Sequence, residues 1–264
     1  MQWKGIAAAV AIMLVAGTAH AGLVGSQVTA TQSLYDVDTS TGAGTVIGPH
    51  GVSSMQGMAF DADTNTLFGV SNSTNSLYTI DPLTGAATLV GALGQSVLSL
   101  AYNTADGSLY GTNISTDELV RINKATGQAT NVGALGFGFV LGLAYDETTA
   151  ALYGVDFATD ALITINTGTG AGANVGGTLA GFDITSLAVD PVTAILYGSD
   201  ISGQQLVQID KRAGTATVVG PHGSAGSFNS LAYVEQVPLP GAAILLGTAL
   251  FGLGLLRERH KRRR

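Results

Sequence analysis

Apolar and polar residues alternate in short stretches through most of the chain, and these stretches recur in a fixed order. Between residues 22 and 236, four phrases return with a period of 42 to 44 residues. Each phrase is bounded by Gly, Asn, Asp or Thr, a pattern typical of short strands joined by tight turns. The region has no 3.6-residue periodicity of amphipathic helices. The pattern therefore predicts four β-strands per repeat.

The four phrases differ in their composition. The first is Met58–Phe60, Leu100–Tyr102, Leu143–Tyr145, Leu187–Val189 and Leu231–Tyr233. The second is Leu67–Gly69, Leu109–Gly111, Leu152–Gly154 and Leu196–Gly198. The third ends in an acid or amide and is Tyr35–Asp38, Tyr78–Asp81, Val120–Asn123, Ile163–Asn166 and Val207–Asp210. The fourth closes on Gly48, Gly91, Gly133, Gly176 and Gly220.

Four strands in a period of about 43 residues is the size of one propeller blade. The count also predicts how the ring closes. Leu23–Gly25 stands as the missing second strand of an incomplete first blade, and Leu231–Val234 is a lone first strand at the other end. Pairing them removes the open sheet edges that a linear array would leave. The prediction is an all-β, five-bladed β-propeller with circular closure by both ends.

The innermost strand has small residues at alternate positions, which share one face of a strand. The pairs are Gly57 and Ala59, Ser99 and Ala101, Gly142 and Ala144, Ser186 and Ala188, and Ser230 and Ala232. Small residues suit the narrow space where five sheets converge. Close contact with a neighbouring blade is the other interpretation of the same pattern.

The beginning of the chain has the features of a removable targeting segment. Lys4 supplies a positive charge, Ile6–Gly17 is an apolar run, and Ala19 and Ala21 form a small-residue cleavage pattern. A bilayer needs about 20 apolar residues, so a run of about a dozen favours a signal peptide over an anchor. We expect residues 1–21 to be removed after Ala21.

The other end has an apolar stretch followed by a cluster of cations. Leu239–Leu256 contains 18 residues, about 27 Å of helix, which is marginally enough to span a hydrocarbon core of about 30 Å. The cations after it are Arg257, Arg259, Lys261, Arg262, Arg263 and Arg264. By the positive-inside rule they hold this end in the cytoplasm and leave the rest outside. A buried core helix with a basic tail is the alternative.

The order of these features resembles the PEP-CTERM sorting signal. A short Pro motif, Val237, Pro238, Leu239 and Pro240, precedes the apolar stretch and the cation cluster, and Leu239 stands where the family usually has Glu. The resemblance covers residues 237–264. It implies an exosortase-type processing enzyme as partner, membrane attachment that is at least transient, and export to the cell envelope or the extracellular space, where the family is associated with exopolysaccharide.

The repeats resemble the bacterial propeller repeats of the YVTN and NHL types, with Ser76–Gly85 as a typical phrase. This resemblance covers residues 22–236 and implies a fold. It does not imply a chemistry, because propellers carry binding modules, scaffolds and hydrolases alike.

Charge and cysteine content exclude several functions for the region 22–236. It has four basic and seventeen acidic residues, a net charge of −13, which repels nucleic-acid phosphates. The chain has no cysteine, so thiolate metal sites and disulfides are not available.

Candidate metal ligands are few, and no cofactor is expected. His50 and His222 occur in identical Gly-Pro-His-Gly settings, on adjacent blades by the repeat count. Two imidazoles are weak candidates for a metal site that would need a third ligand. The simpler interpretation is a repeated Pro-Gly turn with exposed histidines. The segment Asp61–Asn65 has some acids of a calcium loop but lacks its glycine and distal glutamate, which favours a hairpin turn over a weak calcium site.

No residue is assigned a catalytic role, because the chain lacks a nucleophile elbow or a phosphate-binding loop between its ends. The leading hypothesis is a non-catalytic envelope propeller that binds polysaccharide or protein of the extracellular matrix. A metal-dependent hydrolase of the lactonase-like propeller kind is the alternative. A purely structural matrix or coat component is a third hypothesis.

Overall fold

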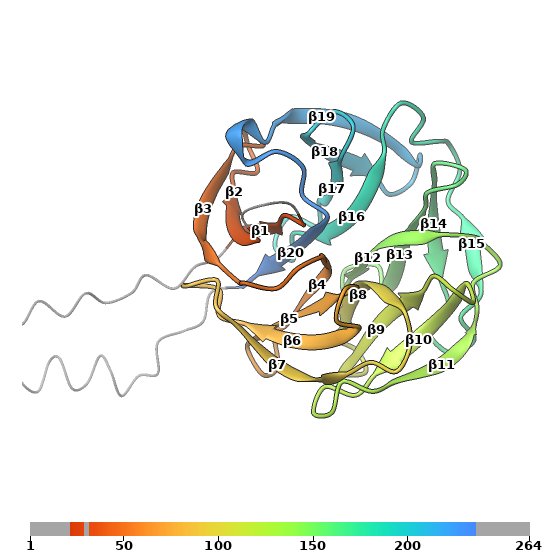
Figure 1. The fold of residues 1–264 in the computed structure, drawn as a ribbon. Coiled ribbons are helices and arrows are strands. Elements are labelled where there is room, and N and C mark those ends of the chain that lie inside the picture. Colours follow the sequence, from red (N-terminus) through yellow and green to blue (C-terminus); the bar gives the residue numbers. More distant parts are fainter. Residues whose placement is uncertain (1–21, 29–31, 236–264) are drawn as a thin grey trace, which may run out of the picture.

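The computed structural model describes residues 22–28 and 32–235, which form five four-stranded antiparallel sheets around a central axis (Figure 1). Blade 1 contains β20 (Ser230–Val234), β1 (Gly22–Ser26), β2 (Ser33–Val37) and β3 (Gly44–Pro49). Blade 2 contains β4 (Met55–Asp61), β5 (Thr66–Ser71), β6 (Ser76–Ile80) and β7 (Ala87–Ala92). Blade 3 contains β8 (Val97–Asn103), β9 (Ser108–Asn113), β10 (Glu118–Ile122) and β11 (Ala129–Ala134). Blade 4 contains β12 (Val140–Asp146), β13 (Ala151–Asp156), β14 (Ala161–Ile165) and β15 (Gly172–Asn174). Blade 5 contains β16 (Ile184–Val189), β17 (Leu196–Asp200), β18 (Gln205–Asp210) and β19 (Thr215–Pro221).

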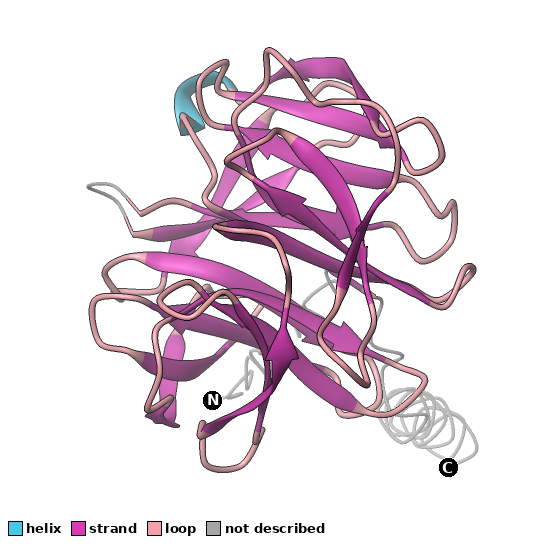
Figure 2. Cartoon of the chain, turned by 90° about the vertical axis from the view of Figure 1, so that its right-hand side faces the viewer, coloured by secondary structure: helices cyan, strands magenta, loops and turns pink. Residues whose placement is uncertain are grey.

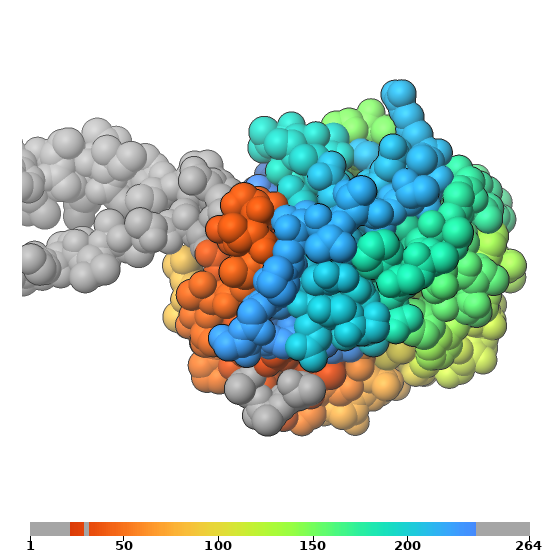
Figure 3. Space-filling view, turned by 90° about the horizontal axis from the view of Figure 1, so that it is seen from above, coloured from red at the N-terminus to blue at the C-terminus, as the bar shows by residue number. Residues whose placement is uncertain are grey.

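The predicted fold and its closure are both confirmed. The first strand of each blade lies nearest the axis (Figure 1). In blade 1 this strand is β20, which pairs with β1 in a register that sets Leu23 opposite Tyr233. On the rim, residues 223–225 near the other end of the described chain contact β3, as orange-red beside blue in Figure 3. No blade of the ring has to leave its inner strand unpaired.

One strand is shorter than the pattern predicts. In blade 4, β15 ends at Asn174, two residues before Gly176. The Asn174 side-chain oxygen accepts a hydrogen bond from the Gly176 N–H at 2.8 Å, and Gly176 has a φ of 144°. An asparagine that bonds the backbone two residues on forms a local turn, which ends the strand there.

The hydrophobic core consists of five clusters, and each lies between two neighbouring blades. The cluster between blades 5 and 1 contains Phe228, which is fully buried on the segment leading into β20. The single short helix of the described chain, η1 (Gly223–Ala225), precedes it on the rim and is cyan in Figure 2. Blades therefore stabilise one another, and no blade has a core of its own.

The recurring glycine of the fourth strand is explained by a contact between blades. A Cβ on Gly48 would lie 2.2 Å from the carbonyl oxygen of Thr84 in the next blade. A Cβ on Gly85 would in turn lie 2.3 Å from the carbonyl oxygen of Gly48. Comparable close approaches join every pair of neighbouring blades, at Gly91, Gly133, Gly177 and Gly220. Only glycine permits two backbones to approach so closely.

The small residues of the inner strands face the adjacent blade. A Cβ on Gly57 would lie 2.8 Å from the backbone of Leu98–Leu100 on the next inner strand. Ala59 belongs to the cluster between blades 2 and 3. Close packing between blades therefore accounts for the alternating small residues, and the alanines among them also line the channel at the axis.

Candidate functional site

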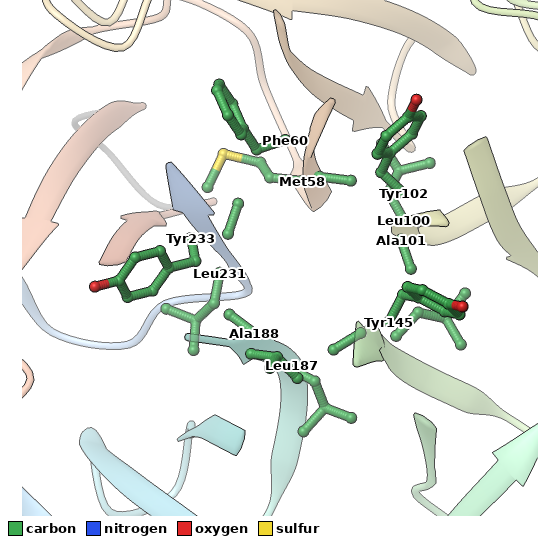
Figure 4. A pocket seen from close by; sticks show the side chains of 15 residues that line it. Met58, Phe60, Leu100, Ala101, Tyr102, Tyr145, Leu187, Ala188, Leu231 and Tyr233 are labelled. Carbon is green, nitrogen blue, oxygen red and sulfur yellow. The ribbon is translucent and has the colours of Figure 1, made fainter. Parts of the chain in front are cut away.

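The axis of the propeller is a narrow channel with apolar walls (Figure 4). Each inner strand contributes a Met or Leu, an Ala and a larger residue, such as Met58, Ala59 and Phe60. The free volume along this part of the channel is about 70 Å³. A binding site on the axis would therefore have to lie at one of the two mouths of the channel.

At one mouth the inner strands end in a ring that we call the tyrosine collar. It consists of Phe60, Tyr102, Tyr145, Val189 and Tyr233. Three acidic residues, Asp146, Glu147 and Glu235, also line this mouth, which encloses about 70 Å³. Burial raises the pKa of Glu235, and the nearby charge of Glu147 adds to that effect.

Two buried aspartates just below the collar are paired with lysines from the next blade. Lys124 contacts the Asp61 carboxylate at 2.7 Å and lies over the Tyr102 ring, 4.7 Å from its centre. Lys211 contacts Asp146 in the same way. Burial by itself raises the pKa of Asp61, but hydrogen bonds from Lys124 and Thr64 outweigh it and hold that pKa below its usual value. These pairs link inner strands to neighbouring blades.

The segment considered for calcium forms the hairpin turn between β4 and β5. The Asp61 carboxylate accepts hydrogen bonds from the Asp63 and Thr64 N–H groups, at 3.0 and 3.1 Å. The Asp63 carboxylate accepts the Tyr102 hydroxyl. Both acids of this segment are therefore engaged by groups of the protein.

The interpretation of the two histidines as exposed turn residues is wrong, because His50 is 5% exposed and His222 is fully buried. The Val52 N–H donates to His50 Nδ1 at 3.2 Å, so the ring proton is on Nε2, which lies 2.9 Å from the Ser26 hydroxyl. His222 Nδ1 lies 3.0 Å from the Gly42 carbonyl and donates to it. Its Nε2 accepts from the Ser199 hydroxyl at 3.1 Å.

Both histidines are therefore neutral members of the core, in opposite tautomers. Burial lowers the pKa of His50 to about 4 and also lowers that of His222. Within residues 22–28 and 32–235, no three His, Cys, Asp or Glu residues come together as a metal site.

A comparison of the repeats explains why histidine occupies these two positions. The equivalent residues after the fourth strands of blades 2, 3 and 4 are Leu93, Leu135 and Leu179, all buried. Their partners on the second strand are Val70, Thr112 and Val155, whereas histidine occurs with Ser26 and Ser199. A polar pair thus replaces an apolar or mixed pair in blades 1 and 5. The paired change was the sequence signal for burial.

The other mouth of the channel was not predicted, and we call it the amphipathic mouth. Its cavity of about 280 Å³ is lined by one equivalent residue from each inner strand and by three residues outside that ring. The ring consists of Gln56, Leu98, Leu141, Thr185 and Asn229, and the outer residues are Phe139, Phe157 and Ile201. Going around the axis, the two leucines are neighbours and the three polar residues are neighbours. This mouth therefore has an apolar half and a polar half.

Several predicted site residues lie outside the described part of the chain. These are the cleavage residues Ala19 and Ala21, and the sorting motif with Val237, Pro238, Leu239, Pro240, Arg257, Arg259, Lys261, Arg262, Arg263 and Arg264. The expected signal peptide and membrane helix lie there too. Within residues 22–28 and 32–235, no helix has the length and apolarity needed to cross a membrane.

The blades, the inter-blade cores and the closed channel define this protein as a β-propeller with five blades. No known protein family and no curated protein matches its sequence. Its fold is similar to a chain in the crystal structure of a nidogen/laminin complex, with a TM-score of 0.60 at 12% identity, covering 81% of this chain and 98% of that one. It is also similar to a protein of unknown function from Bacteroides thetaiotaomicron, with a TM-score of 0.55 at 16% identity, covering 84% of this chain and 66% of that one. At such identities the similarity is one of fold.

Proposed function

We propose that this protein is an exported, envelope-tethered binding module without catalytic activity, and that it engages polysaccharide or protein through the amphipathic mouth. One observation carries the proposal. The five equivalent positions of this ring differ in chemistry, although the adjacent small residues of the inner strands recur in every blade. Packing alone would favour the same type of residue at all five positions, so a ligand is the better reason for the difference.

The positions of the chain ends support this choice of mouth. Glu235, the last described residue, lines the tyrosine collar, and Gly22 lies opposite Val234 in the closing pair of strands. An anchor that begins at Leu239 follows Glu235 by four residues, which span about 14 Å at most. Such an anchor sets the tyrosine collar toward the membrane and leaves the amphipathic mouth facing outward.

The absence of catalysis is proposed from the use of the histidines. General bases in hydrolases are most often imidazoles within reach of substrate. His50 and His222 are buried, and both ring nitrogens of each are hydrogen bonded within the protein. Turnover by the purified protein that one point substitution abolishes would overturn this part of the proposal.

A matched pair of charge substitutions tests which mouth binds. The full chain, purified in detergent, is titrated with extracellular polysaccharide and with surface proteins from the cells that produce it. Leu141→Arg adds a cation to the amphipathic mouth, and Val192→Arg adds one on the opposite side, where Val192 is 88% exposed. We expect Leu141→Arg to abolish binding and Val192→Arg to leave it unchanged. Equal binding by both variants would refute the assignment, and no binding by the wild type would favour a structural coat role.

A further inference from the structure

We infer that the amphipathic mouth binds a neutral aromatic side chain on an extended peptide segment, and that its polar half pairs with the backbone amide of that segment. This inference rests on the proposed function and names its ligand. The eight residues that line the mouth include no charged side chain. The site therefore favours an uncharged group.

The apolar half has an exposed aromatic pair. The centres of the Phe139 and Phe157 rings lie 6.1 Å apart in an edge-to-face arrangement, a geometry that aromatic side chains prefer. Phe139 is 43% exposed. Leu98 and Leu141 extend this surface toward the axis. A further aromatic ring would bury apolar area against all four side chains.

Phe139 is held in a conformation that a bulky residue rarely adopts. Its φ is 61°, in the left-handed region. The Asp117 carboxylate accepts its N–H at 3.1 Å, and its carbonyl accepts the Phe157 N–H at 3.3 Å. Glycine would adopt this conformation without strain. Ser54, at the equivalent position of blade 2, has a φ of 56°, so the turn before the inner strand sets this conformation, and in blade 4 it fixes an exposed ring beside the cavity.

The polar half offers two side-chain amides to a ligand. The Thr185 hydroxyl, at one end of this half, makes no hydrogen bond, but its oxygen is buried within the protein and does not open on the cavity. Asn229 is at the centre of the half and Gln56 is at its other end. The Gln56 amide nitrogen donates to Ser54 at 3.2 Å, which leaves its oxygen free. These groups offer both donors and acceptors to a peptide unit.

The balance of surfaces favours a peptide over a sugar. Five of the eight lining side chains are apolar, and four of them come from the neighbouring blades 3 and 4. A sugar ring carries hydroxyl groups around its whole edge, and those facing the phenylalanines and leucines would lose hydrogen bonds to water. An aromatic side chain has no such groups, and its polar backbone amide lies at one end. The cavity of about 280 Å³ is close to the lower size of known ligand pockets.

The test uses N-acetyl-L-phenylalaninamide as the probe, with N-acetyl-L-alaninamide and cellobiose as comparisons, titrated into the full chain by NMR. A probe of this size should bind with a Kd on the order of 1 mM. Alaninamide and cellobiose should bind at least about tenfold more weakly, because neither has an aromatic ring. Equal binding of alaninamide, or tighter binding of cellobiose, would overturn the inference.

Two variants identify the groups responsible. Phe157→Ala should weaken the probe at least about tenfold. Gln56→Met removes the side-chain amide at similar volume, so we expect weaker binding of the probe with little loss of thermal stability, since the Gln56 oxygen has no partner in the free protein. Val192→Ala, on the opposite side, should change nothing. Unchanged probe binding in Gln56→Met would refute the pairing with the amide. If Leu141→Arg abolishes polymer binding but the probe does not bind, the ligand class is wrong and the proposed function stands.

Discussion

The buried histidine–serine pairs can be replaced by the apolar pair that the protein uses in another blade. Ser26→Val with His50→Leu copies the Val70 and Leu93 pair of blade 2 into blade 1. At neutral pH we expect the double variant to be within about 1 kcal/mol of the wild type, because both partners of the Ser26–His50 hydrogen bond are removed together and only the Val52 N–H loses an acceptor. His50→Leu alone leaves the buried Ser26 hydroxyl without this partner, and should cost about 1–2 kcal/mol relative to the double variant.

The two proteins should differ in acid. The pKa of His50 is about 4 in the folded protein and 6.5 in the unfolded chain, so the unfolded chain binds more protons between these values. The contribution of His50 to the free energy of unfolding is therefore complete above pH 6.5 and is lost as the pH falls toward 4. The difference of roughly 2.5 units corresponds to about 3 kcal/mol for a single group. The pKa of His222 is also lowered, so this histidine contributes in the same direction.

Urea unfolding at pH 7 and pH 4 measures this effect. Carboxylates also titrate in acid, but their contribution is the same in both proteins and cancels in the comparison. The double variant should therefore lose about 3 kcal/mol less than the wild type between pH 7 and pH 4. An equal loss in the two proteins would show that His50 is not held neutral by burial.

Three further substitutions test the contacts between blades, each by urea unfolding at pH 7. Phe228→Ala should destabilise by about 3–5 kcal/mol, because the ring is fully buried where blades 5 and 1 meet, and a loss below about 1 kcal/mol would contradict that packing. Gly48→Ala should destabilise by about 1–3 kcal/mol, because its Cβ would lie 2.2 Å from a carbonyl of the next blade, whereas Gly138→Ala, with no atom closer than 4.0 Å, is the matched control. Lys124→Met should cost about 3 kcal/mol by leaving the buried Asp61 carboxylate without its cation, and it should raise the pKa of that acid, which NMR titration would detect.

The blade count could be predicted from the sequence because the fold repeats its physical requirements. Each blade needs small residues on its inner strand and a glycine where its fourth strand meets the next blade, so these residues recur at a fixed period. The closure followed from the count. The blade that begins with Leu23–Gly25 lacked its first strand, and Leu231–Val234 was a first strand without the other three. Repetition therefore carried the information about the fold.

The surroundings of single residues were harder to predict. The Gly-Pro-His-Gly phrase has the local composition of an exposed turn, and turn propensity describes only the backbone. His50 is buried with its ring against Ser26 of β1, at the position that Leu93 occupies in blade 2. That placement depends on residues distant in sequence, Ser26 above all. Only a position-by-position comparison of the repeats reveals the pairing.

The amphipathic mouth is a second feature that the repeat pattern did not predict. A symmetric ring offers the same chemical group five times around its axis, but a ligand smaller than the ring needs different groups on different sides. Asymmetry can arise only at positions that packing does not fix. The ring residues of the amphipathic mouth, each of which directly precedes Gly57 or its equivalent, occupy such positions. Their side chains reach the mouth of the channel, whereas Gly57 and its equivalents contact the next blade. Departures from a repeat at its least constrained positions are therefore where we expect binding specificity in a propeller. In this chain, they set Leu98 and Leu141 on one side of the mouth and Thr185, Asn229 and Gln56 on the other.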